Sequence, residues 1–203
     1  QTGTRPETFA RGARIVHVDV DAPELNSKVK VHLAVHCDVK SFLTALNGKT
    51  DGLKLPGAGR WRKFIATVRG RYPVGSGPAR SGVDPHFLMC SLSANLPRRS
   101  IVCVDVGQHQ MWAAQSLAIK AGQRFLTQGG MGAMGSALSM AIGAAYAAPG
   151  CVPVVITGDG GFQLNIQELQ TIFSRRLPVK IIMLNNGCYG MVKQFQEQYF
   201  RSR

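Results

Sequence analysis

Acidic residues are scarce in this chain of 203 residues: 11 Asp and Glu stand against 24 Lys and Arg, which gives a formal net charge of +13. A field of this sign attracts polyanions in general. A nucleic-acid-binding surface would also interleave aromatic residues with the basic ones. Aromatic residues make up only 7% of the chain, and no such pattern occurs. We therefore expect a solvated basic linker over residues 60–80 and no nucleic-acid partner.

Paired cysteine motifs are also missing. The five cysteines, at positions 37, 90, 103, 151 and 188, form no C-x-x-C pair, and three of them lie in or beside apolar runs. This pattern favours reduced, buried thiols in a cytoplasmic protein.

Long apolar runs are limited to one stretch without charge, Met131–Ala148, whose 18 residues reach the length of a membrane span. Gly, Ala, Ser and Met dominate this stretch, so it is only weakly hydrophobic. It also lies within an alternating pattern of strands and helices. We expect a helix that packs closely on a sheet, and no membrane contact.

Two shorter apolar runs end in polar turns. VPVVIT at 152–157 is followed by Gly158-Asp159-Gly160, and VKIIML at 179–184 is followed by Asn185-Asn186. Both runs are rich in β-branched residues, which is typical of buried parallel strands. Apolar residues over 164–174 follow a helical spacing, so the whole segment is predicted to form a βαβ unit.

Asp159 and Asn186 should therefore converge, because a right-handed crossover places the ends of its two strands side by side. Carboxylate and amide oxygens suit Mg²⁺ or Ca²⁺ better than zinc. Mg²⁺ completes its shell with phosphate oxygens and water, so we expect a metal-diphosphate unit. Gly160 and Gly161 would let backbone N–H groups approach that anion. The alternative is a tight turn at the first motif and an Asx-type cap at the second.

The spacing of GDG, 24 intervening residues and NN resembles the signature of the thiamine diphosphate enzymes. Four segments in the same order resemble the catalytic subunit of acetolactate synthase (acetohydroxyacid synthase). They are VGQHQMWAAQ at 106–115, GGMGAMG at 129–135, GDGGFQLNIQEL at 158–169 and LNNGCYGMVKQFQE at 184–197. The resemblance implies thiamine diphosphate and Mg²⁺ as cofactors, with FAD as a further candidate.

Val106-Gly107-Gln108-His109 follows a predicted strand and opens a predicted helix. Free backbone N–H groups and the Gln and His side chains there can hold a diphosphate. The alternative is an ordinary strand-to-helix turn with His109 as a polar surface residue. The resemblance makes these four residues cofactor contacts. It adds Gly158, Gly160, Gly161, Asn186, Tyr189, Gly190 and Met191 to the cofactor-binding set.

The resemblance also implies catalytic roles for two residues. The Gly132 carbonyl would accept a hydrogen bond from the cofactor's amino group, and Met134 would bend the cofactor by wedging between its rings. Bending makes the removal of the ring proton intramolecular. The alternative for Met134 is core filling. By the same resemblance, the Mg²⁺ ligands are Asp159, Asn186 and the backbone oxygen of Cys188.

Two carboxylates in the first part of the chain, Asp19 and Asp38, match positions that contact FAD in acetolactate synthases. The alternative is that Asp19 is an ordinary strand-end carboxylate and that Asp38 caps a helix.

The alternation of strands and helices predicts an α/β fold, a doubly wound parallel sheet with helices on both faces. We expect the C-terminal part of a central domain over 1–47, a linker with one helix over 48–84, and an incomplete diphosphate-binding domain over 85–203. Besides the βαβ unit, the expected strands lie at 13–20, 29–35, 100–105 and 124–127. The expected helices lie at 38–46, 60–68, 85–96, 109–119 and 132–148.

The activity implied by the resemblance is decarboxylation of pyruvate and transfer of the hydroxyethyl unit to a second 2-keto acid. Phe195 stands where acetohydroxyacid synthases carry a tryptophan in the acceptor pocket, so another acceptor, such as a keto-sugar, is the alternative. The family's homo-oligomers share active sites between subunits, and a regulatory subunit is a further expected partner.

The glutamate that protonates the cofactor's pyrimidine ring belongs to a domain that these 203 residues do not include. We therefore expect the chain to resemble a fragment that is inactive on its own. The competing interpretation is a non-catalytic module that binds a nucleotide, although no G-x-G-x-x-G motif opens the first strand-helix turn.

Overall fold

A computed structural model describes residues 2–3, 5–53, 57–73 and 82–202. The chain divides into two compact units, residues 1–64 and 65–203, and the division falls within helix α2 (Gly59–Arg71). Part of the linker that we expect over 48–84, at 54–56 and 74–81, lies outside the described residues.

The first unit is a small βα arrangement around two parallel strands that pair from Val16↔Leu33 to Asp19↔His36. These strands begin later than expected: the N–H groups of Ile15 and Val31, which precede them, donate to the side chains of His32 and Asn26 instead of to a strand. The elements are η1 (Pro6–Thr8), β1 (Val16–Asp19), η2 (Ala22–Glu24), β2 (Leu33–His36) and α1 (Val39–Thr50).

Helix α1 begins at Asp38, whose Oδ1 accepts the backbone N–H groups of Lys40 and Ser41 at 2.9 and 3.1 Å. This is an N-cap, which satisfies donors that the first helical turn leaves free. The helix extends four residues beyond the expected end at Leu46. Thr50 stabilises that extra turn by donating its hydroxyl to the Leu46 carbonyl at 2.9 Å.

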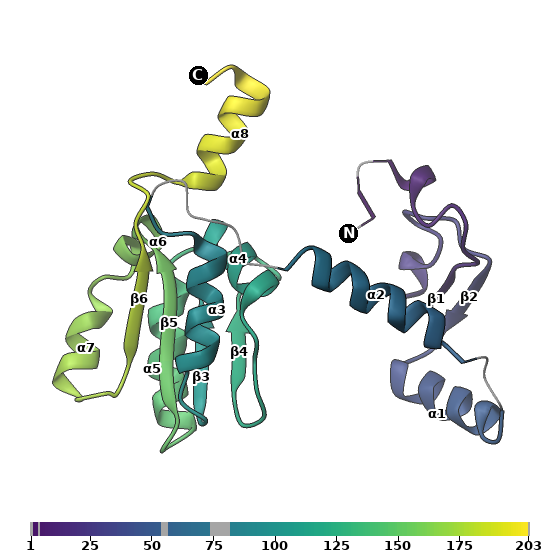
Figure 1. The fold of residues 1–203 in the computed structure, drawn as a ribbon, viewed down its shortest axis with the longest axis horizontal. Helices are drawn as coiled ribbons and strands as arrows, with labels where there is room; N and C mark the ends of the chain where they lie inside the picture. The colour runs from purple at the N-terminus through teal and green to yellow at the C-terminus, as the bar shows by residue number, and fades with distance from the viewer. Residues whose placement is uncertain (1, 4, 54–56, 74–81, 203) are drawn as a thin grey trace. The chain divides into compact units, whose positions relative to one another are not determined.

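The second unit contains a four-stranded, fully parallel sheet in the order β4-β3-β5-β6 (Figure 1). The predicted strands are confirmed as β3 (Ser100–Val104), β4 (Arg124–Thr127), β5 (Val152–Gly158) and β6 (Lys180–Leu184). The chain leaves β3 toward β4 on one side and leaves β5 toward β6 on the other. The strand order therefore reverses between β3 and β5, and sheets of this kind bind ligands beyond that point.

Helices cover both faces of this sheet, which confirms the doubly wound architecture. Alternate residues of β3 face opposite layers, as the two-residue period of a strand requires. Ile101 and Cys103 pack with α5 (Ser136–Ala147) and α7 (Glu168–Ser174), whereas Val102 and Val104 pack with α3 (Pro85–Asn95) and α4 (Gln108–Ser116).

Helix α5 begins at Ser136, four residues later than expected, because Gly132 and Gly135 have φ of 68° and 83°. Those angles lie in the left-handed region and cannot continue a right-handed helix. Ala137, Ala141 and Ala144 of α5 are buried in the core cluster with β3 and β5. None of the helices formed by the described residues is long and apolar enough to cross a membrane.

The helix expected over 164–174 is divided into α6 (Asp159–Leu164) and α7, with a turn between them. Asn165 makes that turn and donates its side-chain N–H to the Gly135 carbonyl at 2.7 Å. Helix α6 thus begins at Asp159, directly after β5. After β6 and its polar turn, α8 (Gly190–Phe200) contains no buried residue.

Replacing Ile156 by alanine should lower the free energy of unfolding by about 2–5 kcal/mol, because the side chain is fully buried in β5 and leaves a cavity. Denaturant unfolding measures the change. Ile181→Ala is the control, since Ile181 is 36% exposed on the neighbouring strand. An equal loss in both variants would contradict this description of the core.

Candidate functional site

The two polar turns that follow β5 and β6 lie on neighbouring strands. Gly158 pairs with Leu184 at the end of the β5–β6 ladder, and Asp159 and Asn186 follow these residues by one and two positions. The structure therefore brings the two turns to one edge of the sheet, as the crossover argument expects.

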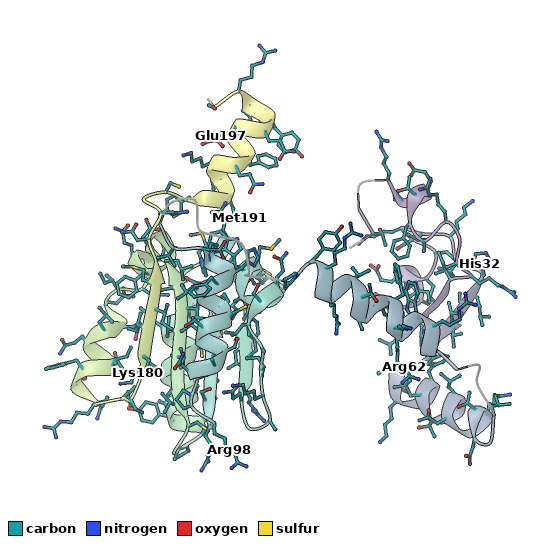
Figure 2. The ribbon with its side chains drawn as sticks, viewed as in Figure 1. His32, Arg62, Arg98, Lys180, Met191 and Glu197 are labelled. Carbon is teal, nitrogen blue, oxygen red and sulfur yellow. The ribbon has the colours of Figure 1, made fainter. Side chains whose placement is uncertain are left out.

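A cavity of about 560 Å³ opens at the carboxyl ends of these strands, a size within the range of ligand pockets. Figure 2 marks the two ends of the sheet: Met191 labels the carboxyl end, and Arg98 and Lys180 label the opposite end. The cavity is lined by 11 of the residues predicted from sequence: Gly107, Gln108, His109, Met134, Gly158, Gly160, Gly161, Asn186, Cys188, Tyr189 and Gly190.

The other lining residues are not among the predicted site residues, although Asn185 belongs to the NN motif. They are Val83, Pro85, Leu88, Trp112, Ile182, Met183, Leu184 and Asn185. Most are apolar residues of α3, α4 and β6, and apolar periodicity alone does not distinguish a cavity wall from a core. For Ile182, Met183 and Leu184, the position directly before the NN motif is the sequence signal that could have identified them.

Two glycines lie where any larger residue would collide with a neighbouring side chain. A Cβ on Gly160 would lie 2.5 Å from Cε1 of Tyr189. A Cβ on Gly190 would lie 2.6 Å from Cδ of Gln108 and 2.9 Å from Nδ2 of Asn186. The loops after β3, β5 and β6 therefore approach one another closely, with side chains of one loop packed against glycines of another.

His109 is buried, with 5% of its surface exposed, so the interpretation of this residue as a polar surface group is wrong. Burial lowers its pKa below 6.5, and this outweighs the opposing effects of the Asp105 charge, a hydrogen bond with the Asp105 backbone, and the Asp159 charge. Its Nε2 atom has no hydrogen-bond partner among the described residues. Such an atom is a candidate contact for a bound polar ligand.

The NN turn has Asx-type hydrogen bonds. Oδ1 of Asn185 accepts the N–H of Gly187 at 3.0 Å, and Oδ1 of Asn186 accepts the N–H of Cys188 at 3.3 Å. The turn alternative is thus present in the structure. An amide oxygen has two lone pairs, so this bond leaves Asn186 able to coordinate a cation as well. Its Nδ2 lies 3.4 Å from Oε1 of Gln108.

The described residues contain no group of three or more His, Cys, Asp or Glu that could hold a metal ion. A cation here would depend on the Asp159 carboxylate, the Asn186 amide oxygen and a backbone oxygen such as that of Cys188. This donor set is all oxygen, and it fits Mg²⁺ or Ca²⁺ that shares further oxygens with a phosphate.

The loop before α5 places its two candidate residues differently. Met134 lines the cavity and is 36% exposed, so it does not simply fill the core. Gly132 donates its N–H to Gln128 at 3.2 Å and does not line the cavity. Val106, Asp159 and Met191 are likewise beside the cavity without lining it.

Asp19 and Asp38 lie in the first unit. Asp19 is the last residue of β1, and Asp38 stands between β2 and α1. Oδ1 of Asp19 accepts the N–H of Asp21 at 2.9 Å. Both carboxylate oxygens of Asp38 accept hydrogen bonds from Ser41, in the first turn of α1. Asp38 is therefore the N-cap of that helix, as the alternative interpretation predicts.

Phe195 is on α8, is 56% exposed and lies 4.6 Å from the ring of Tyr199. It does not line the cavity. Of the five cysteines, only Cys103 is buried, and desolvation raises its pKa to about 11.

Comparison with known proteins identifies the region that builds this cavity. Residues 105–203 match the family described as "Thiamine pyrophosphate enzyme, C-terminal TPP binding domain". This part of the chain belongs to the thiamine pyrophosphate enzyme family. Thiamine pyrophosphate and thiamine diphosphate are the same compound, so the resemblance inferred from the four motifs is confirmed.

The chain is similar to acetolactate synthases. It is 38% identical over 195 residues to acetolactate synthase 2, chloroplastic, of Brassica napus, covering 96% of this chain and 31% of that protein. It is 36% identical over 196 residues to the acetolactate synthase isozyme 2 large subunit of Escherichia coli K12, covering 97% and 35%. The chain thus spans about a third of the length of these curated relatives.

Acidification should destabilise the second unit through His109. Because its pKa in the folded chain is below the ordinary 6.5, the unfolded chain binds the proton more readily. The contribution of neutral His109 to the free energy of unfolding is therefore fully present above pH 6.5. It is lost as the pH falls toward the lowered pKa of the folded chain. Replacing His109 by Gln should flatten that part of the stability profile.

Denaturant midpoints measured from pH 7.5 to 5 without divalent cations check this effect. Ser93→Ala, which changes a buried residue that does not ionise, should leave the slope unchanged. An identical pH profile in wild type and His109→Gln would show that burial of His109 does not shift its titration.

Proposed function

We propose that this chain supplies the diphosphate- and Mg²⁺-binding part of a thiamine diphosphate-dependent carboligase of the acetolactate synthase type. The observation that carries the proposal is the adjacency of the Asp159 and Asn186 turns on β5 and β6, beside a glycine-lined cavity. The family match over residues 105–203 includes both turns and all lining residues of the cavity except Val83, Pro85 and Leu88.

Asp159 and Asn186 would hold Mg²⁺ through side-chain oxygens, and Cys188 through its backbone oxygen. Gln108 and the backbone after β3 would contact the diphosphate. His109 presents its unpaired Nε2 atom close to them. An anion beside that atom would favour the protonated ring, which can donate a hydrogen bond there.

Met134 would fix the bend of the cofactor, since it is the long apolar side chain that enters the cavity from the loop before α5. Gly132 would contribute its carbonyl oxygen as an acceptor. Thiamine diphosphate, when bound, supplies the carbanion and the electron sink for the reaction. The residues of this chain hold and orient it.

The reaction that we propose for the whole protein is decarboxylation of pyruvate and transfer of the hydroxyethyl unit to a second 2-keto acid. We further propose a cytoplasmic homo-oligomer with active sites shared between subunits. The Escherichia coli relative is named a large subunit, which supports a regulatory subunit as a partner. FAD would lie near Asp19 and Asp38, at the ends of β1 and β2, where Asp38 also caps α1.

Titration calorimetry with thiamine diphosphate tests the proposal. Binding should be tighter with Mg²⁺ than with EDTA, because the cation links the diphosphate to Asp159 and Asn186. Replacing Asp159 by alanine should abolish the Mg²⁺-dependent gain while the circular dichroism spectrum stays that of wild type.

Asp51→Ala is the matched control, since it removes an exposed carboxylate from the other unit. It should bind like wild type. Unchanged affinity of Asp159→Ala would remove the metal assignment. Tight binding of NAD or ATP without metal would instead favour a nucleotide-binding module.

A further inference from the structure

Asp105 is the only buried carboxylate among the residues that the structure describes, with 1% of its surface exposed. It follows β3 directly. Its N–H donates to the Ile156 carbonyl at 2.9 Å, which continues the β3–β5 pairing by one residue. Asp105 therefore lies between β3 and β5, where the strand order of the sheet reverses.

One oxygen of this carboxylate joins the loop before α5 to the end of β5. Oδ2 accepts the backbone N–H of Gly135 at 3.0 Å and the hydroxyl of Thr157 at 3.1 Å. These partners are 30 and 52 residues away in sequence. A carboxylate accepts hydrogen bonds more strongly than a neutral oxygen does, so both contacts constrain their loops.

Gly161 packs against the same oxygen. A Cβ at this position would overlap Oδ2 of Asp105 and would lie 3.4 Å from Oγ1 of Thr157. The third glycine of the GDGG sequence, Gly161, is thus required by the buried carboxylate, and not only by the approach of an anion.

Each of the loops tied to Asp105 carries a residue of the proposed cofactor site. Gly135 follows Met134 directly, and its carbonyl is also held by Asn165 at 2.7 Å. Thr157 precedes Gly158 and Asp159. Residues 106–109 follow Asp105 itself, and the ring of His109 hydrogen-bonds with the Asp105 backbone.

We propose that Asp105 is a positioning residue, which through Oδ2 fixes the Met134 loop and the GDG turn relative to the 106–109 turn that follows it. This inference depends on the proposed function only in taking these three loops as the cofactor site. Asp105 itself lines no part of the cavity.

The test begins with the chain free of cofactor. Replacing Asp105 by asparagine weakens the acceptor for the Gly135 N–H, so the Gly135 amide proton should move upfield and exchange faster in ¹H–¹⁵N NMR spectra. The dissociation constant of thiamine diphosphate with Mg²⁺ should rise at least about tenfold, the effect expected from losing a hydrogen bond to a charged group.

A second pair of variants isolates the Thr157 contact. Thr157→Val keeps the shape of the side chain but removes its hydroxyl, whereas Thr157→Ser keeps the hydroxyl. Valine should weaken cofactor binding, and serine should restore it. This pair decides the question if Asp105→Asn does not fold.

Ser93→Ala is the control for loss of stability alone. Ser93 is also buried and accepts a backbone N–H, that of Ala118 at 2.9 Å, but it lies outside the cavity lining. Its replacement should lower the free energy of unfolding and leave the dissociation constant unchanged.

The inference is overturned if Asp105→Asn leaves the Gly135 resonance in place, or if Thr157→Val binds the cofactor as wild type does. It is also overturned if Ser93→Ala weakens binding as much as Asp105→Asn. Failure of wild type to bind thiamine diphosphate would refute the proposed function instead, and the Gly135 resonance would then decide on the role of Asp105.

Discussion

The parallel pairing of β5 with its two neighbours is the constraint on which the rest of the second unit depends. Through β6 it brings the Asp159 and Asn186 turns together, and through β3 it brings Asp105 and His109 to the same edge. Loops of a parallel sheet can converge only when the strands are held in register by a core on each face. Ile156 and Val155, which are fully buried and face opposite clusters, supply that register.

The same arrangement explains why so many small residues surround the cavity. Three loops meet closely here, and a Cβ added at Gly160, Gly161 or Gly190 would collide with a polar or aromatic side chain from another loop. Tyr189 occupies the space beside Gly160, and the Asp105 carboxylate occupies the space beside Gly161. The glycines thus make room for the protein's own side chains. The proposed anion site is the space that these side chains leave unfilled.

Much of the second unit could be predicted from sequence, because β-branched runs and helical spacing identify its strands and helices locally. Asp105 could not be found in this way, since its partners Gly135 and Thr157 are distant in sequence. His109 was open to a surface interpretation because local polarity does not reveal burial. The start of α5 was misplaced because the left-handed glycines before it look like part of the small-residue helix. A residue can also match a motif without lining the cavity. Met191 and Phe195 are examples, since neither of them lines it.

The central claim is that Asp159 and Asn186 share one cation that binds a diphosphate. A crystal structure of the chain with thiamine diphosphate and Mn²⁺ in place of Mg²⁺ tests it most directly. We predict an anomalous scattering peak about 2.1 Å from one oxygen of each side chain and in contact with phosphate oxygens. A bound diphosphate with no such peak, or a peak coordinated by other residues, would contradict the account.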